Sequence, residues 1–249
     1  MRLTRVHVEA ALTPGAIVEL PRETASHLAK VLRARSGDPL VLFSGDGREC
    51  SGSVESVRGS RVTAAVGNGA DVDRESPFAI TLVQCVPRGD RMDFIVQKAT
   101  ELGVTRIVPV LSQRSVVRLD AAQAESKAAH WRAVVVNACE QCGRNRLPVI
   151  EAPAPLIEYL GSSPAAGAGQ PAARFVLEPD VEAAAAPPTA PGTAAMIAVG
   201  PEGGFGDEEL DAFRIAGFLR LRLGPRILRT ETAAIAALTW LQTRFGDMG

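Results

Sequence analysis

Residues 194–218 read AAMIAVGPEGGFGDEELDAFRIAGF, and a glycine-rich turn divides this stretch into two segments of different character. The apolar run AAMIA predicts a short buried strand, whereas GDEELDAFRIAGF predicts an amphipathic helix. A strand, a turn and a helix in this order are typical of a domain in which strands and helices alternate. On its residues alone, the GPEGG turn fits two interpretations: a tight turn whose glycines supply positive φ, or a loop that holds a ligand.

The composition of this turn disfavours a phosphate as its ligand. GPEGG has neither the lysine of a G-x-x-x-x-G-K-[ST] loop nor the spacing of a G-x-G-x-x-G loop. Asp207, Glu208 and Glu209 open the following helix, where their charges suit its positive end and repel a phosphate. A neutral or cationic ligand is therefore favoured over an adenine nucleotide held by its phosphates.

The alternation of strands and helices extends over the chain beyond Pro77. FAITLVQCV, TRIVPVL, RFVLEP and LRLG predict strands, and MDFIVQKATELGV and DAAQAESKAAHWRAVVVNACEQCGRN predict helices. In the first of these helices Ile95, Ala99 and Leu102 share one face, and Gly103 marks the end. This pattern predicts an α/β domain with a mainly parallel sheet. GSSPAAGAGQPAA and EAAAAPPTAPGTAA are of low complexity and are interpreted as surface loops.

The first seventy residues have a different pattern. GAIVEL, PLVLF, CSGSVESV and RVTAAV predict short strands separated by turns. One helical segment, ETASHLAKVLRA, places Leu28, Val31 and Leu32 on one face. The spacing predicts a small β-barrel domain, and the polar stretch ADVDRESP is interpreted as a linker. We therefore expect two domains, residues 1–72 and residues 73–249.

Charge and cysteine content limit the functional classes. The 249 residues carry a net charge of −1, so contact with nucleic acid would depend on local basic patches. Cys139 and Cys142 form a C-x-x-C, but they continue a helical repeat with Trp131, Val135 and Ala138, which favours an apolar helix face over a zinc site. Isolated cysteines, no signal-peptide pattern and no membrane-length apolar run predict a cytoplasmic protein.

A second unusual segment, LGPRILRTETAAIAALTWL, lies near the C-terminus. Thr230 is expected to cap a helix that is apolar almost all round and therefore buried. Arg226 and Arg229 immediately precede it, and buried charges need partners. Two interpretations stay open: the arginines pair with acids such as Glu202 and Glu231, or they face a polyanion.

Charged residues also follow several predicted strands. Arg114, Glu178, Glu202 and Arg229 all come after strand ends, where open α/β sheets bind ligands. The arginines of QRSVVR and CEQCGRNRLP have two interpretations, solvated or helix-capping charge and contacts to RNA.

Four motifs together resemble a known family. IVQKATELGV, EQCGRNRLP, VGPEGGF and LGPRILRTETA occur in this order in the RsmE-type enzymes, the 16S ribosomal RNA uridine-N3 methyltransferases of the SPOUT superfamily. HLAKVLRARSGD resembles the PUA-like RNA-binding domain of that family, so the resemblance spans nearly the whole chain. It implies S-adenosylmethionine as methyl donor, 16S rRNA of the small ribosomal subunit as substrate, a homodimer, no metal, and a deep trefoil knot in the C-terminal domain.

The resemblance also implies which residues hold the cofactor. Three loops of the knot match residues 177–179, 199–204 and 223–233. A sulfonium cation needs no lysine, and glycine loops with apolar leucines suit an adenine ring. The expected cofactor-binding residues are Leu177, Glu178, Pro179, Val199, Gly200, Glu202, Gly203, Leu223, Gly224, Leu228, Thr230 and Ala233.

The remaining expectations concern the reaction and the RNA. Uridine N3 must lose its proton, so Arg229 is the candidate that stabilises the resulting anion or fixes the RNA. Glu202 is expected to orient Arg229 or accept the proton, with Glu140 as the rival base. The candidate RNA contacts are Lys30, Arg33, Arg35, Arg114, Arg118, Gln141, Arg144 and Arg146.

Three other functions are compatible with the sequence: a SPOUT methyltransferase for another base or a ribose 2′-OH, a non-catalytic RNA-binding protein, and a nucleotide-binding α/β enzyme.

Overall fold

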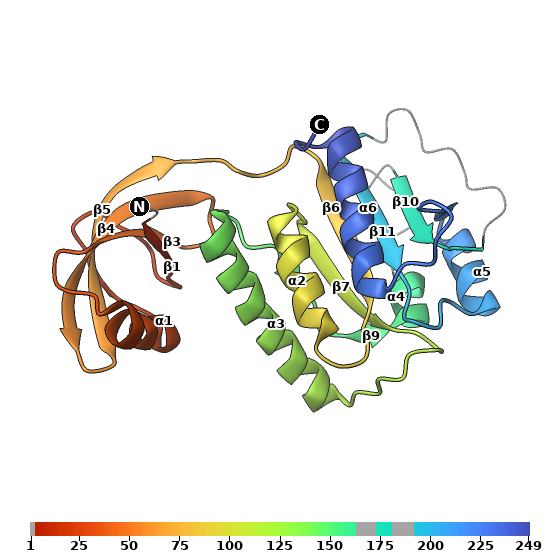
Figure 1. Ribbon diagram of the computed structural model, residues 1–249, viewed down its shortest axis with the longest axis horizontal. Helices are drawn as coiled ribbons and strands as arrows, with labels where there is room; N and C mark the ends of the chain where they lie inside the picture. The colour runs from red at the N-terminus through yellow and green to blue at the C-terminus, as the bar shows by residue number, and fades with distance from the viewer. Residues whose placement is uncertain (1–2, 163–172, 181–191) are drawn as a thin grey trace. The chain divides into compact units, whose positions relative to one another are not determined.

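The computed structural model describes residues 3–162, 173–180 and 192–249. The chain divides into two compact units (Figure 1). Unit 1 comprises Met1–Glu75 and Val136–Leu147, and unit 2 comprises Ser76–Val135 and Pro148–Gly249. The two low-complexity stretches that we interpreted as loops lie largely outside the described residues.

Unit 1 contains a five-stranded mixed sheet in the order β1-β3-β4-β5-β2. β1 pairs with β3 in parallel, and the other neighbours are antiparallel. Val6, Leu42 and Val62 are fully buried in its core. The element bounds are β1 Thr4–His7, β2 Ile17–Glu19, α1 Arg22–His27, η1 Leu28–Leu32, β3 Pro39–Phe43, β4 Arg48–Arg58 and β5 Arg61–Asp71.

The helical segment of unit 1 departs from the sequence expectation. Leu28 is buried as expected, but Val31 is 65% exposed and Leu32 is 49% exposed. After α1 the helix widens into the π-helical turn η1, which ends at Arg33 in the left-handed conformation. A wider turn rotates the residues after Leu28 away from the face that a regular helix would present. The prediction of one apolar face through Leu32 was therefore wrong.

Unit 2 is built around a parallel sheet with the strand order β12-β10-β11-β6-β7-β8, and β9 also pairs with β7. Every pairing between the described strands of this unit is parallel, which confirms the sheet expected from the alternating pattern. The bounds are β6 Ala79–Cys85, α2 Arg91–Glu101, β7 Arg106–Leu111, β8 Val149–Ile150, β9 Ala154–Pro155, α4 Leu156–Ser162, β10 Ala173–Leu177, β11 Ala194–Val199, α5 Asp207–Ile215, β12 Leu219–Leu221 and α6 Thr230–Phe245.

Helices cover this sheet (Figure 1). α6 packs against α2 and against strands β6 and β11, and α4 packs against α5. Phe205, Phe213 and Phe218 are buried together with residues of β6, β7 and β11. β6 is buried along most of its length, as expected for a central parallel strand. None of the helices in the described ranges is long and apolar enough to cross a membrane.

The long helix α3, Ala121–Cys142, begins with a reciprocal cap. Asp120 accepts the backbone N–H of Gln123 at 2.8 Å, and the Gln123 side chain accepts the N–H of Asp120 at 3.0 Å. Trp131 and Cys139 are buried, in agreement with the apolar face predicted for this helix.

Two expectations about the C-terminal segment were wrong in detail. The predicted strand LRLG covers residues 221–224, whereas β12 ends at Leu221 and the chain then leaves the sheet edge to return to α6. Thr230 is the first residue of α6 and not its cap, because Arg229 occupies the cap position. The Thr230 hydroxyl instead donates to the carbonyl of Gly200 at 2.7 Å. It therefore ties the helix start to the glycine turn.

Candidate active site

A cavity of about 260 Å³ lies in unit 2 where the chain leaves β10, β11 and β12. Parallel strands bring their carboxyl ends to one edge of the sheet, which is where such sheets bind ligands. The cavity is lined by Leu177, Glu178, Pro179, Val199, Gly200, Pro201, Glu202, Gly204, Leu221, Arg222, Leu223, Gly224, Arg226, Ile227, Leu228, Arg229, Thr230 and Ala233.

Most of the cavity wall is apolar side chain or glycine backbone. Leu177, Leu223 and Leu228 contribute side chains to the lining. Gly204 and Gly224 have φ values of 65° and 70°, which side chains rarely adopt, so glycine is needed at both turns. This combination suits a largely apolar, planar ligand whose polar edges bond to the backbone.

The structure brings nearly all the predicted cofactor-binding residues together. Each of them except Gly203 lines the cavity. The Gly203 carbonyl instead accepts a hydrogen bond from Arg114 at 3.0 Å. The lining residues that sequence reasoning missed are Pro201, Gly204, Leu221, Arg222, Arg226 and Ile227. These residues lie inside or beside the three predicted loops, and this proximity in sequence would have identified them.

The acidic residues near the cavity have a basic partner from a different element, the helix α2. Arg91, at the start of α2, pairs with Glu202. Its Nε atom also lies 3.9 Å from a carboxylate oxygen of Glu231. Arg91 follows the carboxyl end of β6, so the same strand-end signal could have identified it.

This pairing bears on the two arginines before α6. Within the described residues, the acids Glu202 and Glu231 pair with Arg91, and the side chains of Arg226 and Arg229 form no ion pair. Both arginines are exposed and line the cavity. Of the two interpretations left open by the sequence, the structure therefore favours arginines that face a ligand.

Glu140 lies in unit 1, whereas the cavity lies in unit 2. Its carboxylate accepts the backbone N–H of His7 at 3.0 Å. Burial raises the pKa of the Glu140 carboxyl, and the hydrogen bond from His7 opposes that effect. Its function as a base stays a prediction.

Arg144 is the one predicted RNA contact whose side chain is buried. It is 4% exposed and forms an ion pair with Glu75. The Arg144 Nε atom lies 3.1 Å from each oxygen of that carboxylate. A buried, paired guanidinium cannot reach an RNA phosphate without breaking this pair, so we correct the prediction and assign Arg144 a structural function.

The other predicted RNA contacts are exposed in the two units. In unit 1 these are Lys30, Arg33, Arg35, Gln141 and Arg146, and in unit 2 they are Arg114 and Arg118. Among the residues that the structure describes, no group of three or more His, Cys, Asp or Glu could hold a metal ion.

Two family models match the chain. An RNA methyltransferase domain matches residues 74–242, and an RNA methyltransferase PUA domain matches residues 20–66. The ribosomal RNA small subunit methyltransferase E of Mycobacterium tuberculosis is 34% identical over 93% of this chain and 88% of its own length. Its namesake in Bacillus subtilis is 30% identical over 96% of this chain and 93% of its own.

Solved structures are similar over the whole length. The ribosomal RNA small subunit methyltransferase E from Neisseria gonorrhoeae, bound to S-adenosyl methionine, is 36% identical with a TM-score of 0.88 and covers 100% of both chains. A Legionella pneumophila protein in complex with the cofactor SAM is 37% identical with a TM-score of 0.92, over 99% of this chain and 100% of that one.

Proposed function

Because this chain belongs to the ribosomal RNA small subunit methyltransferase E family, we propose that it transfers a methyl group from S-adenosylmethionine to N3 of a uridine in 16S ribosomal RNA. The resemblance drawn from the four sequence motifs is confirmed. The fold class is confirmed as well: a SPOUT-type α/β domain with a parallel sheet follows a PUA-like domain with a mixed sheet. The trefoil knot stays a prediction.

The cavity at the ends of β10, β11 and β12 is the observation that carries the proposal. Its volume of about 260 Å³ is close to the lower end of the roughly 300 to 1,000 Å³ typical of small-molecule sites. Leu177, Leu223 and Leu228 offer apolar surface for the adenine ring, and the glycine turns offer backbone groups for its polar edge. When bound there, the cofactor supplies an electrophilic methyl group on a sulfonium cation.

The residues around the cavity have complementary functions in this proposal. Arg229, exposed and without an ion-pair partner among the described residues, stabilises the negative charge that develops when uridine N3 loses its proton. Glu202 accepts that proton, and its ion pair with Arg91 holds its carboxylate at the cavity edge. Glu140 remains the rival base. Transfer then depends mainly on in-line positioning of N3.

Further parts of the proposal concern partners and organisation. The exposed basic residues named above contact RNA phosphates, which would make binding depend on salt. The enzyme acts in the cytoplasm as a homodimer, and its domains are residues 1–72 and 73–249.

Calorimetry on the full-length chain with S-adenosylmethionine, ATP and NAD tests the cofactor. We expect binding of S-adenosylmethionine, and binding of NAD or ATP in its place would overturn the proposal. Mass mapping of 16S RNA from a strain that lacks the gene, with and without the wild-type gene restored, tests the reaction. The restored strain should regain one methyl group on a uridine base. A methyl group on a ribose or on another base would support a different SPOUT activity.

A further inference from the structure

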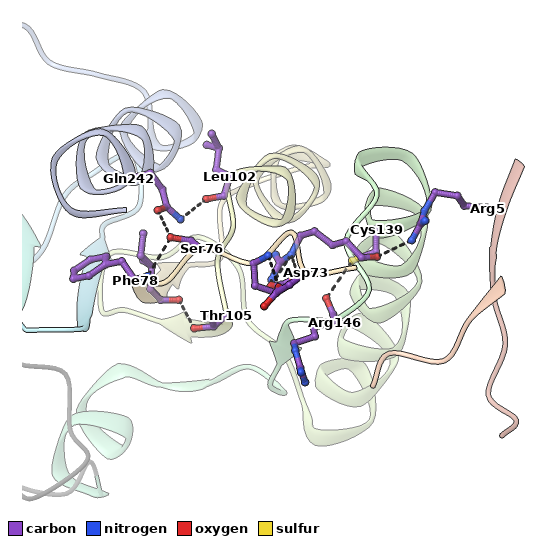
Figure 2. Close-up of polar contacts among 12 residues, drawn as sticks. Arg5, Asp73, Ser76, Phe78, Leu102, Thr105, Cys139, Arg146 and Gln242 are labelled. Carbon is purple, nitrogen blue, oxygen red and sulfur yellow. Dashed lines mark hydrogen bonds and ion pairs between the residues drawn. The ribbon is translucent and has the colours of Figure 1, made fainter. Parts of the chain in front are cut away.

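Two glutamines among the described residues of unit 2 are fully buried, and they differ in how their hydrogen bonds are satisfied. Gln242, on α6, is bonded at both ends: its Nε2 donates to the Leu102 carbonyl at 2.9 Å, and its Oε1 accepts from Ser76 at 2.7 Å (Figure 2). Such pairing explains a polar side chain in a core by structure alone. Gln84, in the apolar strand β6, has no such explanation.

The amide of Gln84 donates twice and accepts nothing. Its Nε2 donates to the carbonyl of Cys85 at 2.9 Å and to the Thr230 hydroxyl at 3.0 Å. Its Oε1 is buried and has no hydrogen-bond partner among the described residues. Burying an amide oxygen in this way is unfavourable, and an apolar residue in the same strand would avoid it.

The orientation of this amide follows from the next hydrogen bond. The Thr230 hydroxyl lies 2.7 Å from the Gly200 carbonyl, which can only accept. The single hydroxyl proton is therefore directed at Gly200, so the group facing Thr230 from the other side must be a donor. Only the Nε2 end of Gln84 meets this requirement. We call the chain of hydrogen bonds from Gln84 through Thr230 to Gly200 the glutamine relay.

The glutamine relay connects two walls of the cavity. Gly200 belongs to the turn after β11 and Thr230 to the start of α6, and both line the cavity. Gln84 does not line it, but it stands beside Val199 in the parallel register of β6 and β11. A change at Gln84 can therefore reach the ligand only through neighbours that line the cavity: Thr230 and Gly200 through the hydrogen bonds, and Val199 through the strand pairing.

We propose that Gln84 is a positioning residue for the cofactor: it directs the Thr230 hydroxyl onto Gly200 and so sets the separation between the GPEGG turn and the start of α6. The unpaired oxygen destabilises the folded state. In return, the preorganised cavity lowers the free-energy cost of binding the cofactor. This inference rests on the proposed function, because it identifies the ligand of the cavity with S-adenosylmethionine.

The decisive comparison is between Gln84→Met and Gln242→Met in the full-length protein. Both variants remove a buried amide and keep a similar volume. Gln242→Met leaves Ser76 and the Leu102 carbonyl without this partner and should lower the melting temperature, whereas Gln84→Met also removes the unpaired oxygen and should lower it less. Gln242 lies twelve residues from Thr230 along α6, about 18 Å away. Only Gln84→Met should weaken S-adenosylmethionine binding, by about tenfold in Kd. The KM for S-adenosylmethionine should rise to match, with kcat at saturating cofactor nearly unchanged.

A second variant and a cofactor-free measurement complete the test. Gln84→Leu also removes the donor to Thr230 and adds no polar group, so it should weaken binding as much as Gln84→Met; it also carries the test if Gln84→Met does not fold. Amide hydrogen exchange of cofactor-free protein should become faster at residues 200–204 and 230–233 in both Gln84 variants, and not in Gln242→Met.

The outcomes separate the two proposals. If wild-type protein does not bind S-adenosylmethionine, the proposed function fails whatever the exchange data show. If wild type binds it and the Gln84 variants bind equally well, or Gln242→Met weakens binding as much as they do, the positioning function of Gln84 is wrong.

Discussion

Arginines occur in two of the recognisable motifs, EQCGRNRLP and LGPRILRTETA, and Arg144 of the first motif differs from both arginines of the second in burial and in pairing. In the first motif Arg144 is buried in unit 1 and paired with Glu75. In the second, Arg226 and Arg229 are exposed at the cavity of unit 2 and pair with no described residue. The difference teaches that burial and partners, and not residue type or motif, separate an arginine that stabilises the fold from one that is available to a substrate.

The largest expected effect comes from removing the buried arginine, Arg144. Arg144→Ala should lower the free energy of unfolding by about 3 to 5 kcal/mol, because it leaves the Glu75 carboxylate buried without its partner. Chemical denaturation measures this. As a control, Arg132→Ala breaks the exposed pair with Glu125 and should cost less than about 1 kcal/mol. Equal losses in the two variants would contradict the structural assignment of Arg144.

Removing the exposed arginine Arg229 should have the opposite result: a loss of activity with little loss of stability. Arg229→Ala should reduce kcat by about 100-fold to 1,000-fold, the loss expected when a charge-stabilising donor is removed. Its unfolding free energy should change by no more than about 0.5 kcal/mol. Arg214→Ala, on the exposed side of α5, is the matched control and should leave kcat unchanged. Turnover that survives Arg229→Ala with normal cofactor binding would remove Arg229 from the mechanism.

A smaller effect concerns Glu140, whose pKa is raised by burial. The folded state therefore holds the Glu140 proton more tightly than the unfolded state. This contribution to stability is present at low pH and is lost as pH rises from the ordinary carboxyl pKa through the raised one. Glu140→Gln should remove the loss, so the unfolding free energy of the wild type should fall relative to that of the variant as pH rises above the ordinary carboxyl pKa, and chemical denaturation at several pH values measures this. If the unfolding free energies of wild type and Glu140→Gln change in parallel with pH, the burial of Glu140 has no such effect.

The smallest expected effect is on RNA binding, and it concerns a second exposed arginine, Arg118. Arg118 is exposed, so Arg118→Gln should weaken RNA binding a few-fold. The magnitude of the negative slope of log K against log salt concentration should also fall by about 1, the contribution of one phosphate contact. Arg132→Gln, with its exposed charge already paired to Glu125, should leave the slope unchanged. An unaltered slope in Arg118→Gln would place that residue outside the RNA contact.

Much of the site followed from local pattern. The strand-end pattern indicated Glu178, Glu202 and Arg229, which all line the cavity, whereas the other predicted lining residues came from the resemblance of the motifs to the family. Local sequence carries this information because parallel strands deliver their carboxyl ends to the same sheet edge. The pattern could not assign partners. Arg91 pairs with Glu202 across 111 positions of sequence, and nothing in either segment indicates the other.

The sequence by itself determined the two kinds of domain, the parallel sheet, the loops of the cavity and, through four motifs, the family. These depend on periodicity, glycine placement and residue identity, which are local properties of the chain. The tertiary structure decided which arginines are buried, which acid meets Arg91, and that Thr230 bonds to Gly200 and Gln84 instead of capping its helix. Those are contacts between segments far apart in sequence, and a buried polar group takes whichever partner the packing brings within reach.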